Sequence, residues 1–87
     1  MEKYNELSAF IGNIIFLKEK AGLDNMTMAD LLNIDIDTME KMDSGEIVDN
    51  ISVEILLHIQ KHFGILPHDM FDDSLPYHLK YVNLSLR

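Results

Sequence analysis

The sequence has no cysteine and no long apolar run. Without cysteine, neither disulfides nor thiolate metal sites can add to the stability of the fold, so stability must come from packing or self-association. The longest apolar run, residues 14–17, is far shorter than the ~20 residues of a membrane-spanning helix. The first residues also lack a basic region followed by an apolar stretch. We therefore expect a cytoplasmic protein with no membrane partner, and a reducing compartment fits the missing cysteine.

Basic residues are also scarce. The 87 residues include 7 Lys and Arg against 15 Asp and Glu, which gives a net charge of −8 and a pI near 4.7. Affinity for nucleic acid rests largely on Lys and Arg side chains that neutralise phosphates. The composition therefore argues against a polyanionic partner and favours a basic partner or none.

The acidic residues are concentrated between residues 24 and 49. This stretch has eight acids and a single base, Lys41, so its local charge is −7, whereas the rest of the chain sums to only −1. The acids are Asp24, Asp30, Asp35, Asp37, Glu40, Asp43, Glu46 and Asp49. Any function assigned to this segment must be compatible with a strongly negative surface.

The length allows one small core, because a chain of this size buries only a little over ~60% of its unfolded surface. With 47% hydrophobic and 25% charged residues, the composition is that of an ordinary soluble globule. We expect a helical bundle over residues 1–71, followed by a C-terminal extension over residues 72–87.

Apolar spacing and capping residues predict three helices before residue 46. Apolar residues recur at three- and four-residue spacing over residues 3–21, and Gly22 is typical of a helix end. Asp24 or Asn25 can cap a second helix to residue 32, and Asp35 can cap a third to about residue 43, which ends at Gly45. The residues expected to face inward are Met28, Ala29 and Leu32 in the second helix and Ile36, Met39 and Met42 in the third.

A fourth helix and a change of period follow. Ser52 can cap a helix that closes at Gly64, and residues 65–71 indicate a further short helical turn, with Met70 and Phe71 under the bundle. The fourth helix is expected to face inward with Ile55, Leu56, Ile59 and Phe63. Residues 77–87 alternate with a period nearer two than 3.6, which predicts a strand.

Several of these residues form a pattern that resembles the Cro/CI-type helix-turn-helix, also called the XRE family. The pattern comprises Gly22-Leu23, Met28-Ala29, Leu31-Leu32-Asn33-Ile34, Thr38-Met39 and Gly45. It implies that Ala29 lets the third helix cross closely, that Asn33 makes the turn, and that Lys18 and Asp43 pair. The expected fold is therefore all-α, a compact four- to five-helix bundle of the phage-repressor type, with the helix-turn-helix proper at residues 24–43 and a possible β-strand in the extension.

The resemblance implies a transcriptional regulator that binds operator DNA as a dimer through the third helix. The residues at the family's contact positions are Asn25, Asp35, Asp37, Thr38, Glu40, Lys41 and Ser44. The acidic charge supports an alternative, in which a degenerate helix-turn-helix acts through a basic protein partner, as an antagonist or a DNA mimic, with little or no DNA binding.

Apolar residues outside the inward stripes indicate a protein interface, since exposed apolar residues often mark interfaces. A slight rotation of the bundle that buries Ile15 or Phe16 is an equally open alternative. An apolar edge strand in the tail would be an aggregation hazard, so we expect a homodimer. The candidate interface residues are Ile15, Phe16, Ile47, Val48, Tyr81, Val82, Leu84 and Leu86.

Catalytic and metal patterns are incomplete in this sequence. Asp35, Asp37, Asp43 and Glu46 match positions of a calcium loop, but the loop's central oxygen ligand and glycine are replaced by Met39 and Glu40. Three histidines, His58, His62 and His68, have no accompanying carboxylate motif. No nucleophile with a base, and no phosphate-binding glycine loop, can be assembled. We expect no enzyme, no cofactor, no metal and no small-molecule substrate.

Overall fold

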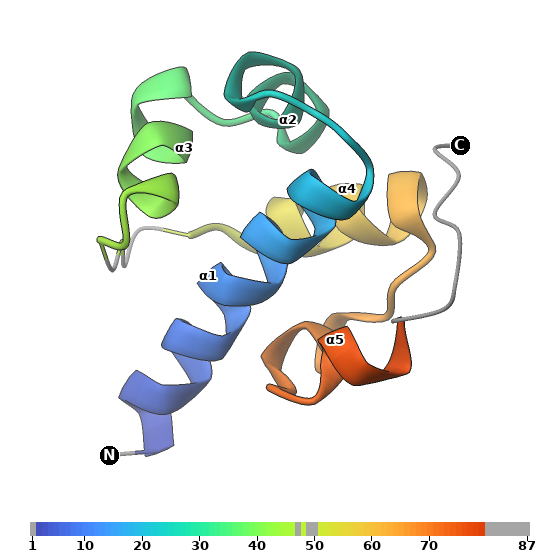
Figure 1. The fold of residues 1–87 in the computed structure, drawn as a ribbon. Helices are drawn as coiled ribbons and strands as arrows, with labels where there is room; N and C mark the ends of the chain where they lie inside the picture. The colour runs from blue at the N-terminus through green and yellow to red at the C-terminus, as the bar shows by residue number, and fades with distance from the viewer. Residues whose placement is uncertain (1, 47, 49–50, 80–87) are drawn as a thin grey trace.

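The fold consists of helices throughout the described part of the chain. The computed structural model describes the backbone of residues 2–46, 48 and 51–79, and the side chains of these residues from residue 7 onward. Five α-helices and one 3-10 helix follow one another (Figure 1): α1 (Glu2–Lys20), α2 (Asn25–Leu32), α3 (Ile36–Asp43), α4 (Val53–Phe63), η1 (Pro67–Phe71) and α5 (Leu75–His78). The helices α2 and α3 lie at one end of the molecule and η1 and α5 at the other, with α1 and α4 between them.

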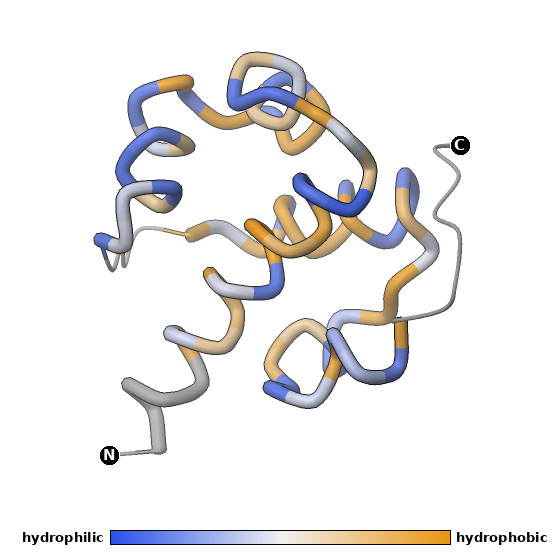
Figure 2. Tube along the Cα trace, in the orientation of Figure 1, coloured by the Kyte–Doolittle hydropathy of each residue, from blue (hydrophilic) through white to orange (hydrophobic). Residues whose placement is uncertain are grey.

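The core lies where these helices meet, and among the described residues its buried side chains are apolar apart from Asn13 and Lys18 of α1. Figure 2 shows that the middle of α1 and most of α4 are hydrophobic, whereas hydrophilic residues dominate α3. The buried apolar residues come from every helix: Phe10, Ile11, Ile14, Leu17, Met28, Ala29, Leu32, Met39, Met42, Ile55, Ile59, Phe63, Met70 and Leu75, together with Ile65 before η1. Because α3 contributes only Met39 and Met42, most of its surface faces solvent.

The connections within the first half were predicted from local signals, and the structure confirms them. The helix α1 ends before Gly22, which has a φ of 72°. Asn33 joins α2 to α3 with a φ of 57° and a ψ of 47°, in the left-handed region that asparagine tolerates better than most residues. Its N–H donates to the carbonyls of Ala29 and Asp30, so the last turn of α2 is closed.

The second half is tied to α1 by an amide that the sequence reasoning did not single out. Asn13 is buried, and its Nδ2 donates to the carbonyl oxygens of Met70 and Asp72, each at 2.9 Å. Phe71 stacks on Phe10, with ring centroids 5.0 Å apart. These contacts hold η1 against α1, and Leu75 of α5 is buried in the same core.

The expectation of a strand in the tail is wrong for the described residues. Tyr77 and His78 belong to α5, and Leu79 is its C-terminal cap. A helix starts here because Pro76 lies in its first turn, where proline's fixed φ suits a helix and its missing N–H costs nothing. The rest of the expected strand, residues 80–87, lies outside the described part of the chain.

Three side chains are less buried than their sequence patterns predict. Ile36 was expected to face inward but is 41% exposed. It is the first residue of α3, and the buried residues of this helix, Met39 and Met42, lie in its later turns. Leu56 is half-buried, and Phe71 is 40% exposed although one face of its ring packs on Phe10. The exposure of Ile36 bears directly on the candidate site.

Candidate interaction surface on α2 and α3

The outward surface of α2 and α3 is lined by carboxylates. We use the name acidic surface for the exposed residues Asp24, Asp30, Asp35, Asp37, Glu40 and Glu46. They are exposed because the inward positions of both helices are occupied by apolar residues, which leaves the polar residues on the opposite side. Among the residues predicted to contact DNA, Asp37, Glu40 and Lys41 are exposed on α3, and Asp35 is exposed at its N-terminal cap.

The only base of this segment is already engaged. Lys41 Nζ lies 3.4 Å from Asp37 Oδ2, one helical turn away on α3. Both side chains are largely exposed, so the pair contributes only ~0 to 1 kcal/mol to stability. The pair nevertheless offsets the one positive charge between residues 24 and 46, and within the described ranges no other carboxylate of the acidic surface forms a salt bridge.

Asp43 is also exposed, but its carboxylate connects three helices. Its Oδ1 lies 3.5 Å from Nζ of Lys18 on α1, which confirms the pair expected from the sequence. Its Oδ2 accepts a hydrogen bond of 3.2 Å from Nδ2 of Asn25 on α2. Lys18 is mostly buried, with 11% of its side chain exposed, so Asp43 is the group that neutralises a charge at the edge of the core.

The remaining expected contact residues are also engaged within the protein or partly covered. The amide of Asn25 is held by Asp43, and its Oδ1 is buried with no hydrogen-bond partner in the described part of the chain. Ser44 Oγ donates to the carbonyl of Lys41 at 2.9 Å. Thr38 is half-buried. The side chains that the resemblance places on a phosphate backbone are thus directed at neighbouring protein groups.

Asp24 is both part of the acidic surface and the cap of α2. Its Oδ1 accepts a hydrogen bond of 2.8 Å from the N–H of Thr27, which is one of the N–H groups that a helix leaves without an internal partner. This backbone hydrogen bond, with a further one from the Thr27 side chain, lowers the pKa of Asp24 below its ordinary value. Asp24 is therefore charged at neutral pH, and its negative charge also interacts favourably with the positive N-terminal end of the α2 dipole.

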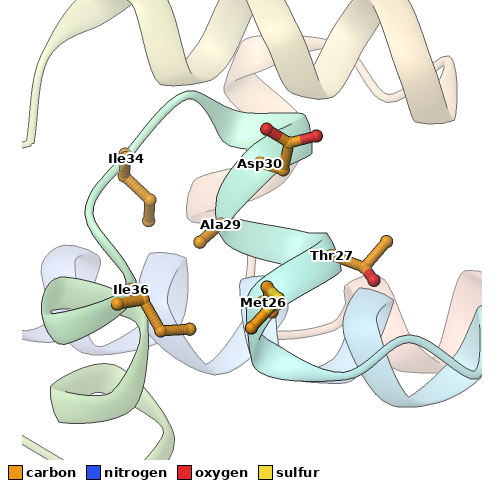
Figure 3. A pocket seen from close by; sticks show the side chains of 6 residues that line it. All are labelled: Met26, Thr27, Ala29, Asp30, Ile34 and Ile36. Atoms are coloured by element: carbon orange, nitrogen blue, oxygen red, sulfur yellow. The ribbon is translucent and has the colours of Figure 1, made fainter.

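An open hollow interrupts the acidic surface between α2 and the start of α3. Its volume is about 470 Å³, and it is lined by Met26, Thr27, Ala29, Asp30, Ile34 and Ile36. Figure 3 shows Met26 and Ile36 on facing sides of the hollow, with Ala29 and Ile34 beside them. Met26 is 72% exposed and Ile36 is 41% exposed, so two apolar walls are in contact with solvent.

Sequence reasoning missed this hollow, although one signal for it was present. Met26 lies off the inward stripe of α2 that Met28, Ala29 and Leu32 define, so its exposure follows from helical periodicity. The exposure of Ile36 depends on how α3 crosses α2, which periodicity does not determine.

The residues expected to form a protein interface are only partly described. Ile15, Phe16 and Val48 are half-buried and pack against the core. For Ile15 and Phe16 this agrees with the alternative in which a slight rotation of the bundle covers them. The other expected interface residues lie outside the described part of the chain: Ile47, Tyr81, Val82, Leu84 and Leu86.

A group of polar side chains before and within α5 resembles part of an active site. Asp72 Oδ1 accepts hydrogen bonds from the Ser74 N–H and from Ser74 Oγ, at 2.9 and 2.7 Å, and these lower the pKa of Asp72. The Ser74 hydroxyl donates to Asp72, and His78 Nε2 lies 3.2 Å from Ser74 Oγ. The group closes the turn before α5.

His58 and His62 stack on α4, with ring centroids 6.3 Å apart. Within the described ranges, no three His, Cys, Asp or Glu side chains are close enough to hold a metal ion together.

Comparisons with protein-family models, curated proteins and solved structures gave no match. None of the described helices has the length and apolar character needed to cross a membrane. The geometry of the surface therefore carries the functional argument.

Proposed function

We propose that the chain is a binding protein whose α2–α3 unit acts through a basic protein partner rather than through DNA. The observation that carries this proposal is the placement of charge: seven exposed carboxylates lie on α2, α3 and the adjoining turns, while Asp43 is paired with Lys18 and Lys41 is paired with Asp37. In this account the unit keeps the helix-turn-helix arrangement of the Cro/CI type, while its outer surface has the opposite sign from one that meets phosphates.

Electrostatics favours the basic protein partner over DNA. A protein that binds DNA gains affinity by releasing counterions, roughly one for each phosphate that a Lys or Arg neutralises. The acidic surface would instead bring unpaired carboxylates close to phosphates, which costs energy at every contact. Against a basic protein, the same carboxylates raise the association rate and the specificity.

Exposed apolar side chains on the same surface support a protein partner independently of charge. Met26 and Ile36 offer contact area that a phosphate backbone cannot use, whereas protein interfaces combine an apolar centre with a polar rim. Asp30 lines the same hollow, and Asp35 and Asp37 are exposed residues adjacent to Ile36 in the sequence, which gives this combination.

A second candidate is operator binding as an XRE-type regulator, which the sequence resemblance and the turn at Asn33 favour. In that case α3 would read bases with Asp37, Thr38, Glu40 and Lys41, since carboxylates can accept from cytosine N4 and Lys can donate to guanine. Its phosphate contacts would come from Asn25 and Ser44.

Two titrations at low salt separate these candidates. Fluorescence anisotropy follows the binding of labelled duplexes, including the DNA upstream of the chain's own gene, and in parallel the binding of a labelled oligolysine peptide. We expect saturable, salt-sensitive binding of oligolysine and no saturable binding of any duplex. Tight, sequence-dependent binding of a duplex would contradict the proposal and support the regulator.

The homodimer stays a prediction, because the residues expected to pair, 81–87, lie outside the described part of the chain. Deletion of these residues should lower the mass measured by sedimentation equilibrium from that of a dimer to that of a monomer. An equal mass before and after the deletion would remove the tail from the interface.

A further inference from the structure

The hollow between α2 and the first turn of α3 has apolar walls that face solvent. Met26 and Ile36 form opposite sides, and Ala29 and Ile34 continue the apolar lining (Figure 3). Its volume of about 470 Å³ is within the range of ~300 to 1,000 Å³ that is common for ligand sites in proteins. Because its walls at Met26 and Ile36 are 72% and 41% exposed, the hollow suits a side chain presented by a surface better than an enclosed small molecule.

Carboxylates lie near these apolar walls. Asp30 lines the hollow, and Asp35 and Asp37 stand on either side of Ile36 in the sequence. Asp37 shares its charge with Lys41, whereas Asp30 and Asp35 have no salt-bridge partner in the described part of the chain. A group that enters the hollow must therefore be apolar at its centre and leave space for cations at its sides.

We propose that the hollow receives one apolar side chain from a partner segment that carries Lys or Arg on both sides of that side chain. This inference rests on the proposed function and specifies the chemistry of the partner. A purely basic segment would leave Met26 and Ile36 in water, and a purely apolar segment would take Asp30 and Asp35 out of water without compensation. A second copy of this chain would bring its own acidic surface close to the first, and like charges would repel.

The test uses labelled nine-residue peptides that consist of lysines around one central residue. The central residue is Leu, Ile, Val, Met or Phe in the probes and Ser in the reference peptide, so that the peptide charge is constant. Fluorescence anisotropy with the full chain should show that the best apolar peptide binds at least about tenfold more tightly than the Ser peptide, since burial of one large apolar side chain is worth this much.

Variants of the walls then locate the contact. Met26→Ser and Ile36→Ser, singly and together, should remove the advantage of the apolar centre and leave the affinity for the Ser peptide unchanged. Val53→Ser and Leu57→Ser are the matched controls, because both side chains are exposed apolar residues on α4, at 72% and 58%. These control changes should leave every affinity unaltered, and circular dichroism verifies that each variant is folded.

The possible failures are distinguishable from one another. Equal binding of all peptides, including the Ser peptide, would overturn the hollow as a docking site while the proposed function stands. Absence of binding by every peptide would overturn both. Self-association that Met26→Ser and Ile36→Ser abolish would also overturn the inference, because the occupant would then be a second copy. The comparison of Leu and Ser peptides on the unmodified chain gives a result even if a wall variant does not fold.

Discussion

At the scale of single residues, Asp43 and Asp37 show that two similar ion pairs have different roles. Asp43 lies against Lys18 at the edge of the core and also accepts from Asn25, so it joins α3 to both α1 and α2. Asp37 pairs with Lys41 on the exposed side of α3. The first pair belongs to the fold, and the second only modifies the charge of the acidic surface.

We therefore expect Asp43→Asn to lower the free energy of unfolding by about 1 to 2 kcal/mol, because it leaves the mostly buried ammonium of Lys18 without its counter-charge. Asp37→Asn is the matched control and should change it by less than about 0.5 kcal/mol, as exposed pairs contribute little. Urea unfolding followed by circular dichroism measures both. Equal effects of the two substitutions would show that Asp43 has no special structural role.

The cap at Asp24 makes one contribution to stability dependent on pH. Its folded pKa is lowered, first by the hydrogen bond from the Thr27 N–H, so the folded state binds the proton less readily than the unfolded state. The stabilisation is thus present above the unfolded pKa of about 4 and is lost as the pH falls through the lower folded value. At neutral pH the Asp24 cap therefore makes its full contribution to stability.

The difference in urea midpoint between the unmodified chain and Asp24→Ala should consequently shrink as the pH is lowered from 6 towards 3. Asp24→Asn is the control, since asparagine caps a helix without a titrating group and should show no such trend relative to Ala. A difference that is constant over this pH range would contradict the role of the ionised carboxylate.

At the scale of helices, the turn between α2 and α3 places the two halves of the candidate surface. Asn33 takes up the left-handed backbone conformation there, and this conformation costs ~1 to 2 kcal/mol for most side chains. Asn33→Val should destabilise the chain by about that amount, whereas Asn33→Gly, which relieves the constraint, should be close to neutral. Thermal unfolding followed by circular dichroism distinguishes them, and a Val variant as stable as the Gly variant would mean that the turn rearranges freely.

The same turn shows how much of the fold local sequence determines. The helix bounds of α2 and α3 and the role of Asn33 depend on neighbouring residues, and the sequence predicted them. For the cap of α2 the sequence left Asp24 and Asn25 as alternatives, and the structure shows Asp24. The exposure of Ile36 and the contact between Asn25 and Asp43 depend on how helices cross, so they became apparent only in the structure. At Tyr77 an alternating pattern predicted a strand, but Pro76 starts the short helix α5.

At the scale of the whole molecule, charge is distributed very unevenly. The segment from residue 24 to 49 carries −7 of the net −8, while its inward side chains build an ordinary apolar core. The fold and the surface charge of the α2–α3 unit are therefore separate properties. The charge can be reversed by substitution at exposed positions without altering the core.

Asp37→Lys combined with Glu40→Lys would change the charge of this segment from −7 to −3, because each substitution adds two units. We expect the affinity for oligolysine to fall by roughly tenfold to thirtyfold, and non-specific binding of duplex DNA to strengthen at low salt. Glu54→Lys, at an exposed position of α4, is the control for charge alone. If the control has the same effect per unit charge, the binding site is not on α3.

The most direct test of the central claim is an NMR titration of the ¹⁵N-labelled chain, first with the lysine peptide that has a central Leu and then with a duplex. We expect saturable shifts for the backbone amides of α2 and α3, strongest around Met26, Asp30 and Ile36, and no shifts with the duplex at the same concentration. Peptide-induced shifts confined to other helices, or duplex-induced shifts along residues 35–44, would contradict the claim.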